Sequence, residues 1–440
     1  MTGDNTTAAA TPGAERAPPP ASQVLAVVIG NALEFFDFLA FAFFAAQIGR
    51  TFFPSDQPIL SLLASLATFG AGFLTRPLGA FVIGRMADRV GRKPAMLLTF
   101  TLMGVAMLGI GLTPGFAAIG VIAPVLAVTF RLIQGFALGG EVGPNTAFLI
   151  EAAPVSKRAR YVSLQYVSQS VAVLAAGGIG VALAHYLTPA DLDLWGWRVP
   201  FLIGAIIVPF GFMLRRTLVE TLPDHEAEEA AFAGADGAAP APRAGYARLA
   251  ILGLMLLASG TVISYLLTYF TTYASSTLGM ADDVAFGATV VNGLTGAVFC
   301  YVGGMLADRF GRKPVMMWPH IAMMMLVLPC YWAIEHFRTA EALYGVTFLL
   351  VMLASISAVP VLVAITESLP ARVRAGSLAM IYAVAISVFG GSTQFVVAWL
   401  GDLLHDPLTP AWYMLTFSAA GLLAMLALPE SAPGKIRRRG

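Results

Sequence analysis

Charged residues and cysteines are scarce in this sequence of 440 residues. Only 12% of the residues are charged and 58% are hydrophobic, whereas about a quarter of a typical soluble domain is charged. The 26 basic and 25 acidic residues nearly cancel, which excludes the basic surplus of a nucleic-acid-binding protein. The two cysteines, Cys300 and Cys330, lie inside apolar runs, so neither a disulfide framework nor a zinc cluster is expected. A chain of this length needs no apolar excess to fold in water. The excess therefore predicts a protein embedded in a lipid bilayer.

Long apolar runs, by contrast, are abundant. Clusters of charge, proline and glycine divide the chain into twelve apolar segments, most of them near the roughly 20 residues that a membrane-spanning helix needs. We therefore expect an all-α polytopic membrane protein with twelve transmembrane helices. The segments run over 24–48, 59–84, 95–113, 118–143, 161–186, 199–214, 248–272, 284–306, 315–334, 341–366, 376–401 and 410–428.

The polar stretches indicate how the chain is organised. Residues 1–22 are mostly Thr, Ala and Pro, a composition that predicts a disordered tail. Residues 215–247 predict a linker between two six-helix bundles, 23–214 and 248–428, and residues 429–440 form a short basic tail. Most of the lysines and arginines fall on one side of the predicted spans. The positive-inside rule then places both termini and the linker in the cytoplasm, with the protein in the cell inner membrane.

Two motifs occur twice. The sequence GRMADRVGRKP at 84–94 returns as GMLADRFGRKP at 304–314. The sequence EAAP at 151–154, with basic residues after it, returns as ESLP at 367–370. Each pair occupies the same place in its six-helix half. Two bundles related by a parallel repeat predict a substrate site at their interface, near the middle of the membrane.

The repeated D-R-x-G-R-K loops, the two six-helix halves and the linker resemble the major facilitator superfamily over the whole chain. Four further motifs resemble its metabolite:proton symporter branch, and within it the chain is most similar to citrate and tricarballylate symporters. The resemblance implies the major facilitator fold, transport of a small organic anion with protons by alternating access, and a monomeric functional unit. The four motifs are GNALEFFDF at 30–38, TRPLG at 75–79, RLIQGFALGGE at 131–141 and WGWRVPF at 195–201.

The resemblance also implies a gating role for the repeated loops. In this superfamily an aspartate such as Asp88 or Asp308 bridges to nearby arginines and to the start of a helix in the other half, closing one face. Negative charge at a helix N-terminus is also physically favourable. The candidate gating residues are Asp88, Arg92, Asp308, Arg312, Glu151, Arg160, Glu367 and Arg374.

Five ionisable residues fall inside the predicted spans: Glu34, Asp37, Arg76, Arg131 and Glu141. Each costs roughly 2.5–3.5 kcal/mol at the bilayer centre, so they must face one another or a wet cavity. Arginine binds both oxygens of a carboxylate, and a poorly hydrated cavity favours the protonated form of an acid. We expect the two arginines to bind a substrate carboxylate and the three acids to carry the coupling proton. The alternative is that these charges only neutralise one another and hold three helices together.

The remaining candidate contacts are uncharged. Gln134 lies three residues after Arg131, on the same helix face. His320 is interpreted as a packing residue, and the sequence lacks the nucleophile–base pairs and metal-ligand clusters of an enzyme. We expect no cofactor, with the proton as coupling ion and the bilayer and a small anion as partners. The other predicted substrate contacts are Asn31, Gln165, Tyr265, Tyr269, Asn292 and Tyr382.

Other substrates and modes of transport remain open at this point. A zwitterionic osmolyte such as betaine or proline, or a shikimate-like acid, is carried within the same branch. Uniport or export by the same fold is also possible, because gradients rather than residues set the direction.

Overall fold

The structure is a computed structural model that describes residues 21–90, 92–139, 146, 149–150, 153–205, 209, 243–369 and 374–432. Some side chains within these ranges, including those of Glu34 and Asp37, lie outside the description.

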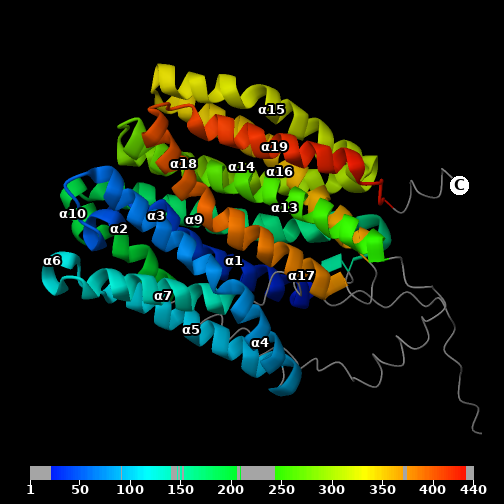
Figure 1. Cartoon of the computed structure of the whole chain (residues 1–440), viewed down its shortest axis with the longest axis horizontal. Helices are drawn as coiled ribbons and strands as arrows, with labels where there is room; N and C mark the ends of the chain where they lie inside the picture. The colour runs from blue at the N-terminus through cyan, green and yellow to red at the C-terminus, as the bar shows by residue number, and fades with distance from the viewer. Residues whose placement is uncertain are drawn as a thin grey trace, which may run out of the picture.

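The described residues form helices joined by short turns (Figure 1). The longer helices of the first half are α1 (Ala21–Phe43), α2 (Ala45–Phe52), α3 (Pro58–Leu74), α4 (Arg76–Val90), α5 (Arg92–Leu112), α7 (Ile122–Leu138) and α9 (Arg158–Tyr186), with the short α6 (Phe116–Ile119) and α10 (Pro189–Leu194) between spans. Those of the second half are α13 (Arg243–Thr272), α14 (Asp282–Phe310), α15 (Arg312–Phe337), α16 (Ala340–Ser368), α17 (Arg374–Ala385), α18 (Gly391–Leu404) and α19 (Thr409–Ala427).

The protein is a multi-pass membrane protein. Among the described residues, eight helices are long and apolar enough to cross a bilayer, or nine if the bent pair α1 and α2 forms one span. Two shorter apolar helices cover Leu97–Leu112 and Ile122–Leu138. Each predicted segment overlaps a described helix, but 118–143 and 199–214 extend beyond the described residues. Residues 199–205 are helical, whereas 140–143, 206–208 and 210–214 lie outside the description.

The two halves meet along α9 and α14. In Figure 1 the first half lies below the second, with α9 next to α14 at the centre. Glycines allow this close approach, because a Cβ atom at Gly293 would lie 2.3 Å from the backbone nitrogen of Leu174. A Cβ atom at Gly177 would lie 2.8 Å from the Thr289 side chain. Small residues permit such tight packing of membrane helices.

On the other flank the halves meet through α3 and α18. Here the backbones of Gly70 and Gly391 touch, since a Cβ atom at Gly70 would lie 2.4 Å from the Gly391 carbonyl oxygen. Gly391 follows a π-helical turn, η5 (Ile386–Gly390), that connects α17 to α18. The α3–α18 flank and the α9–α14 seam therefore enclose the space between the halves from two sides.

A proline explains why α3 and α4 are separate helices. Pro77 has no N–H to donate to the Phe73 carbonyl oxygen four residues earlier, so the helical ladder is interrupted at this point. The freed Phe73 oxygen accepts a hydrogen bond of 2.9 Å from the Ser387 hydroxyl in η5. The Thr75 hydroxyl donates to the Leu132 oxygen of α7 at 2.8 Å. The break lies next to Arg76, which is buried inside the bundle. The two hydrogen bonds tie the break to η5 and to α7.

Candidate substrate site and latch

Two arginines lie buried inside the first half. Arg131 on α7 is fully buried, and Arg76 at the start of α4 is 7% exposed. The Arg131 guanidinium lies 4.1 Å from the centre of the Phe38 ring, and the Arg76 guanidinium lies 4.6 Å from the same centre. Such a contact stabilises a desolvated cation by about 2 kcal/mol. We call this group the arginine cage; it consists of Arg76, Arg131, Phe38, Phe41, Phe69 and Phe73.

The polar contacts of the two arginines leave donors unused. Arg131 donates from Nε to the Phe69 oxygen at 3.4 Å, and from Nη1 to the Phe38 oxygen and to Oε1 of Gln134. Arg131 Nη2 and Arg76 Nε are buried without a hydrogen-bond partner among the described groups. No carboxylate whose side chain the structure describes pairs with either arginine. The cage therefore has spare capacity to bind an anion.

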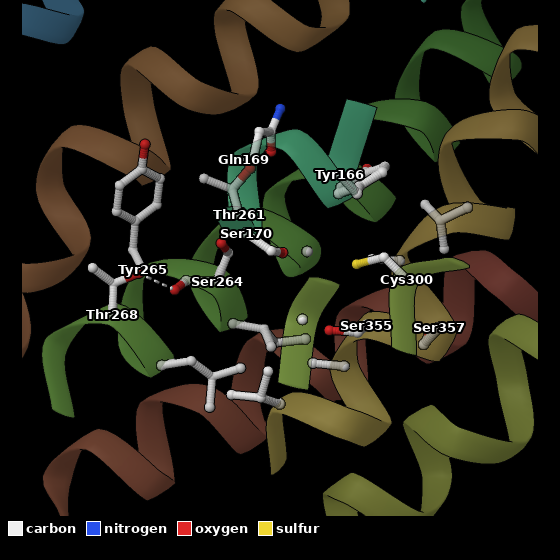
Figure 2. A pocket seen from close by; sticks show the side chains of 18 of the residues that line it. Tyr166, Gln169, Ser170, Thr261, Ser264, Tyr265, Thr268, Cys300, Ser355 and Ser357 are labelled. Atoms are coloured by element: carbon white, nitrogen blue, oxygen red, sulfur yellow. Dashed lines mark hydrogen bonds between the residues drawn. The ribbon is translucent and has the colours of Figure 1, made fainter. Parts of the chain in front are cut away.

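A cavity of about 200 Å³ lies next to the cage, between the halves. It is lined from the first half by α1 and α9 and from the second half mainly by α13, α14 and α16 (Figure 2). Apart from His320, the described residues that line it carry no acidic or basic side chain. Its polar lining consists of hydroxyl, amide and thiol groups, including those of Gln169, Ser170, Thr261, Ser264, Cys300 and Ser355.

Tyr265 joins the cage to the cavity. It lines the cavity from α13, and its ring packs on Phe73 and Phe69 of the cage, with ring centres 5.6 and 6.0 Å apart. Gly390 makes room for this ring, because a Cβ atom there would lie 3.1 Å from it. Tyr382 of α17 lines the same cavity. The cage and the cavity are thus two regions of one site, separated by a tyrosine from the second half.

Four of the predicted substrate contacts lie at the cage or at the cavity. Gln134 binds Arg131, and Tyr265, Tyr382 and Asn292 line the cavity. The amide of Asn292 donates to the Leu267 carbonyl oxygen at 3.2 Å, which fixes its orientation.

Asn31 and Gln165 do not line the central cavity. The Asn31 amide donates to the Ser168 hydroxyl at 2.7 Å and to the Gln165 carbonyl oxygen at 3.2 Å. The Gln165 side-chain oxygen accepts from the Thr146 hydroxyl at 2.8 Å. The Asn31 amide therefore joins α1 to α9, and the Gln165 side chain binds Thr146. Their role as substrate contacts stays a prediction.

Tyr269 also lies away from the cavity. It is four residues after Tyr265, which moves it about 6 Å along the helix axis. There it packs in an apolar cluster with Phe270 and Tyr273. It lines a separate cavity of about 710 Å³ between α2, α3 and α18, together with Arg50. Tyr269 therefore lines a different cavity from Tyr265, and its role as a substrate contact stays a prediction.

Some predicted residues cannot be placed. The side chains of Glu34, Asp37, Asp88, Arg92, Glu141, Glu151 and Arg374 lie outside the described part of the chain. Among the side chains that are described, no three His, Cys, Asp or Glu residues gather as a metal site would require.

Asp308 belongs to the last turn of α14 in the second half, and its side chain lies at the start of α9 in the first half. Its two carboxylate oxygens accept hydrogen bonds from the backbone N–H groups of Ala159 and Arg160 at 3.0 and 3.1 Å. Because the first N–H groups of a helix have no partners within it, an acid here satisfies them and complements the helix dipole. Asp308 also binds Arg312 at 3.1 Å. This carboxylate links the two halves directly.

Arg312 extends these contacts within the second half. It is 2% exposed and binds both oxygens of Glu367, at 3.1 and 3.2 Å. Glu367 also lies 3.9 Å from Arg158 at the start of α9. We call Asp308, Arg312, Glu367 and the first turn of α9 the latch.

Glu430 is a member of this region that the sequence analysis missed. It accepts hydrogen bonds from the N–H groups of Arg312 and Lys313, at 2.9 and 3.0 Å, and so caps α15. Burial alone would raise the pKa of Glu430, but these backbone hydrogen bonds and the Arg312 charge outweigh burial and lower it. Its neighbour Ser431 donates to Glu367 at 2.9 Å. No local signal marks Glu430, because it caps a helix that begins 118 residues earlier.

Comparison with known proteins agrees with this architecture. The profile of the Major Facilitator Superfamily matches residues 27–392. The chain is 36% identical over 411 residues to a citrate-proton symporter of Klebsiella pneumoniae, covering 91% of this chain and 90% of that protein. It is 32% identical to an alpha-ketoglutarate permease of Escherichia coli, covering 92% and 93% of the two chains.

Solved structures show the same fold. A crystal structure of a D-xylose-proton symporter superposes with a TM-score of 0.74 at 19% sequence identity, covering 94% of this chain and 98% of that one. The architecture is therefore the twelve-helix fold of these transporters, and the protein is a transporter rather than an enzyme. The chain belongs to the Major Facilitator Superfamily.

Proposed function

We propose that this protein is a proton-coupled symporter that carries citrate, or another di- or tricarboxylate, by alternating access. The observation that carries the proposal is the arginine cage, in which two buried cations retain free donors and contact no described carboxylate. An arginine fork binds carboxylates in a bidentate manner, and a hydrogen bond to a charged group is worth about 1.5–3 kcal/mol. The similarity of this chain to a citrate-proton symporter supports the same class of substrate.

The phenylalanine rings help to hold the two cations in a dry interior. Neighbouring guanidinium groups need compensation there, and the ring faces and backbone carbonyl oxygens provide it. A substrate carboxylate that reaches the two arginines from the cavity, past Tyr265, binds them more strongly than the phenylalanine rings do. Because Tyr265 belongs to the second half, binding draws the halves together and favours the occluded state.

We assign the coupling proton to Asp37, Glu34 and Glu141. Glu141 falls in the same predicted span as Arg131, and Asp37 directly precedes Phe38 of the cage in the sequence. Asp37→Asn should abolish accumulation driven by a proton gradient while exchange of substrate across the membrane continues. Concentrative uptake by this variant under a proton gradient would contradict the assignment of Asp37.

The latch supports alternating access. Opening of the face that carries Asp308 requires its carboxylate to release the first turn of α9. The excess of basic residues in the sequence near this end supports a cytoplasmic position for it, for the linker and for both termini, with the protein in the inner membrane.

A zwitterionic osmolyte is the second candidate, since a proline/betaine transporter of Salmonella typhimurium is 31% identical to this chain. Recognition of a quaternary ammonium needs unoccupied aromatic faces. Here the guanidinium groups themselves cover the rings of Phe38, Phe69 and Phe73. The geometry therefore favours an anion.

Purified protein in liposomes tests the proposal. With an acidic exterior, we expect concentrative uptake of labelled citrate that a protonophore abolishes. Binding of citrate should raise the melting temperature of the protein, and betaine at the same concentration should not. Accumulation of betaine or shikimate without accumulation of any di- or tricarboxylate would overturn the proposal.

A further inference from the structure

Three helices bring a thiol and two hydroxyl groups together in the wall of the central cavity. Ser170 comes from α9, Cys300 from α14 and Ser355 from α16. The Cys300 thiol and both serine hydroxyls lie in the wall of the same cavity. Figure 2 shows the sulfur and the two oxygens directed toward the same space. We call these residues the Ser–Cys–Ser cluster.

A glycine creates room for this cluster. A Cβ atom at Gly296, one turn before Cys300 on α14, would lie 2.5 Å from the Ser170 hydroxyl and 3.8 Å from the Ser355 hydroxyl. Any side chain at position 296 would displace the Ser170 hydroxyl from the space it shares with Cys300. The cluster therefore depends on the close approach of the two halves at α9 and α14.

The two serines differ from most hydroxyl residues of this bundle. Ser and Thr in helices commonly donate to the carbonyl four residues earlier, as Thr347 and Thr366 of α16 do at 2.7 Å. Within the described part of the chain, the hydroxyls of Ser170 and Ser355 donate to no backbone carbonyl. Each hydroxyl therefore retains a donor and an acceptor for a ligand in the cavity.

We propose that the Ser–Cys–Ser cluster is a subsite for the hydroxyl group of a hydroxycarboxylate, such as the hydroxyl on the central carbon of citrate. The inference rests on the proposed function and specifies it further. Neutral, weak donors cannot offset the desolvation of a carboxylate. A hydroxyl both donates and accepts, so it matches two serines and a thiol. The arginine cage then binds carboxylates, and the cluster selects the hydroxyl.

Comparison of citrate with tricarballylate tests the subsite. Tricarballylate has the same three carboxylates and lacks the hydroxyl. We expect the Ser170→Ala/Ser355→Ala variant, which loses two hydrogen bonds, to bind citrate about 5–150-fold more weakly than the unmodified protein, or about 1–3 kcal/mol. Its affinity for tricarballylate should change by less than about twofold.

Ser357→Ala is the matched control. Ser357 lines the same cavity from the same helix as Ser355, but its hydroxyl donates to the Met316 carbonyl oxygen at 2.7 Å. We expect this variant to leave the ratio of citrate to tricarballylate affinity unchanged. Should the double variant fail to fold, the single variants Ser170→Ala and Ser355→Ala should each lower the ratio about threefold.

The outcomes separate the two proposals. If the unmodified protein binds both tricarboxylates and the serine variants leave their affinity ratio unchanged, the subsite is wrong and the proposed function stands. The subsite is equally wrong if Ser357→Ala lowers the ratio as much as the serine variants do. If the unmodified protein binds neither compound, the proposed function fails and the subsite fails with it.

Discussion

The two halves of the molecule share repeated motifs but offer the substrate different chemistry. The first half provides two buried cations, Arg76 and Arg131, held on phenylalanine rings. The second half lines most of the cavity with hydroxyl groups, a thiol and tyrosine rings. A repeated fold can thus assign attraction of the anion to one half and recognition of its neutral groups to the other. The difference also implies that equivalent positions in the two halves are not interchangeable.

The largest effect is expected at the arginine cage. Arg131→Lys keeps a positive charge but loses the planar fork, and should weaken citrate binding about 10–150-fold, or 1.5–3 kcal/mol. Isothermal titration against citrate and an uncharged amide analogue measures this effect. Equal losses for both ligands would remove Arg131 from the site.

Arg198→Lys provides the control for this substitution. Arg198 donates to the carbonyl oxygens of Gly111 and Thr113 at 3.0 and 2.6 Å, at the end of α5. Lysine at position 198 should lower the melting temperature without changing the affinity for citrate.

The latch should control rate rather than affinity. Asp308→Asn keeps the shape of the side chain but removes the charge that binds Arg312 and the first turn of α9. We expect turnover in liposomes to fall about tenfold, which corresponds to about 1.4 kcal/mol, and the dissociation constant to change less than about twofold. Asp88→Asn, in the matching loop of the first half, should act in the same direction. An unchanged rate with weakened binding would place Asp308 in the substrate site instead.

A tyrosine pair on α13 tests where the second half contacts the anion. Tyr265→Phe keeps the ring contacts with Phe69 and Phe73 but removes the hydroxyl, and should weaken citrate binding about fivefold, the value of one hydrogen bond. Tyr269→Phe, one turn along the helix, should leave binding unchanged. Equal effects of the two substitutions would mean that the central cavity is not the binding site.

The smallest effect is expected at Glu430. Because its pKa in the folded protein is lowered, its contribution to stability is complete above the ordinary value of 4.5 and disappears as the pH falls through the lowered value. Glu430→Gln should therefore melt about 1–2 °C below the unmodified protein at pH 7. The difference should shrink as the pH falls through the lowered pKa. A difference that stays the same from pH 7 into acid would contradict the capping role of the carboxylate.

The sequence predicts the helices well because lipid imposes a simple rule on composition. Apolar length and charge position identify the spans, and the repeated loops indicate two halves. The pairing of Arg131 with Gln134 also follows from helix geometry, since residues three apart share a face.

The rotation and depth of each helix are not local properties, and here prediction from the sequence fails. Asn31 and Gln165 have the residue types of a binding site, but the Asn31 amide binds the backbone oxygen of Gln165, and the Gln165 side chain binds Thr146. Ser170 and Ser355 resemble any mid-span serine until the structure shows that their hydroxyls leave the backbone carbonyls unbonded. Glu430 acts on a helix start that is distant in the chain. Each depends on contacts that only the folded chain creates.

The contact between Gly70 and Gly391 has a consequence for mutational tolerance. Both residues meet through backbone atoms, and every replacement of glycine adds at least a Cβ atom, which at position 70 would lie 2.4 Å from a carbonyl oxygen. No replacement at either position is therefore conservative, however small the new side chain. Neither residue lines the central cavity, so we expect a missense change here to alter the conformation in which the empty carrier rests, leaving the chemistry of recognition intact.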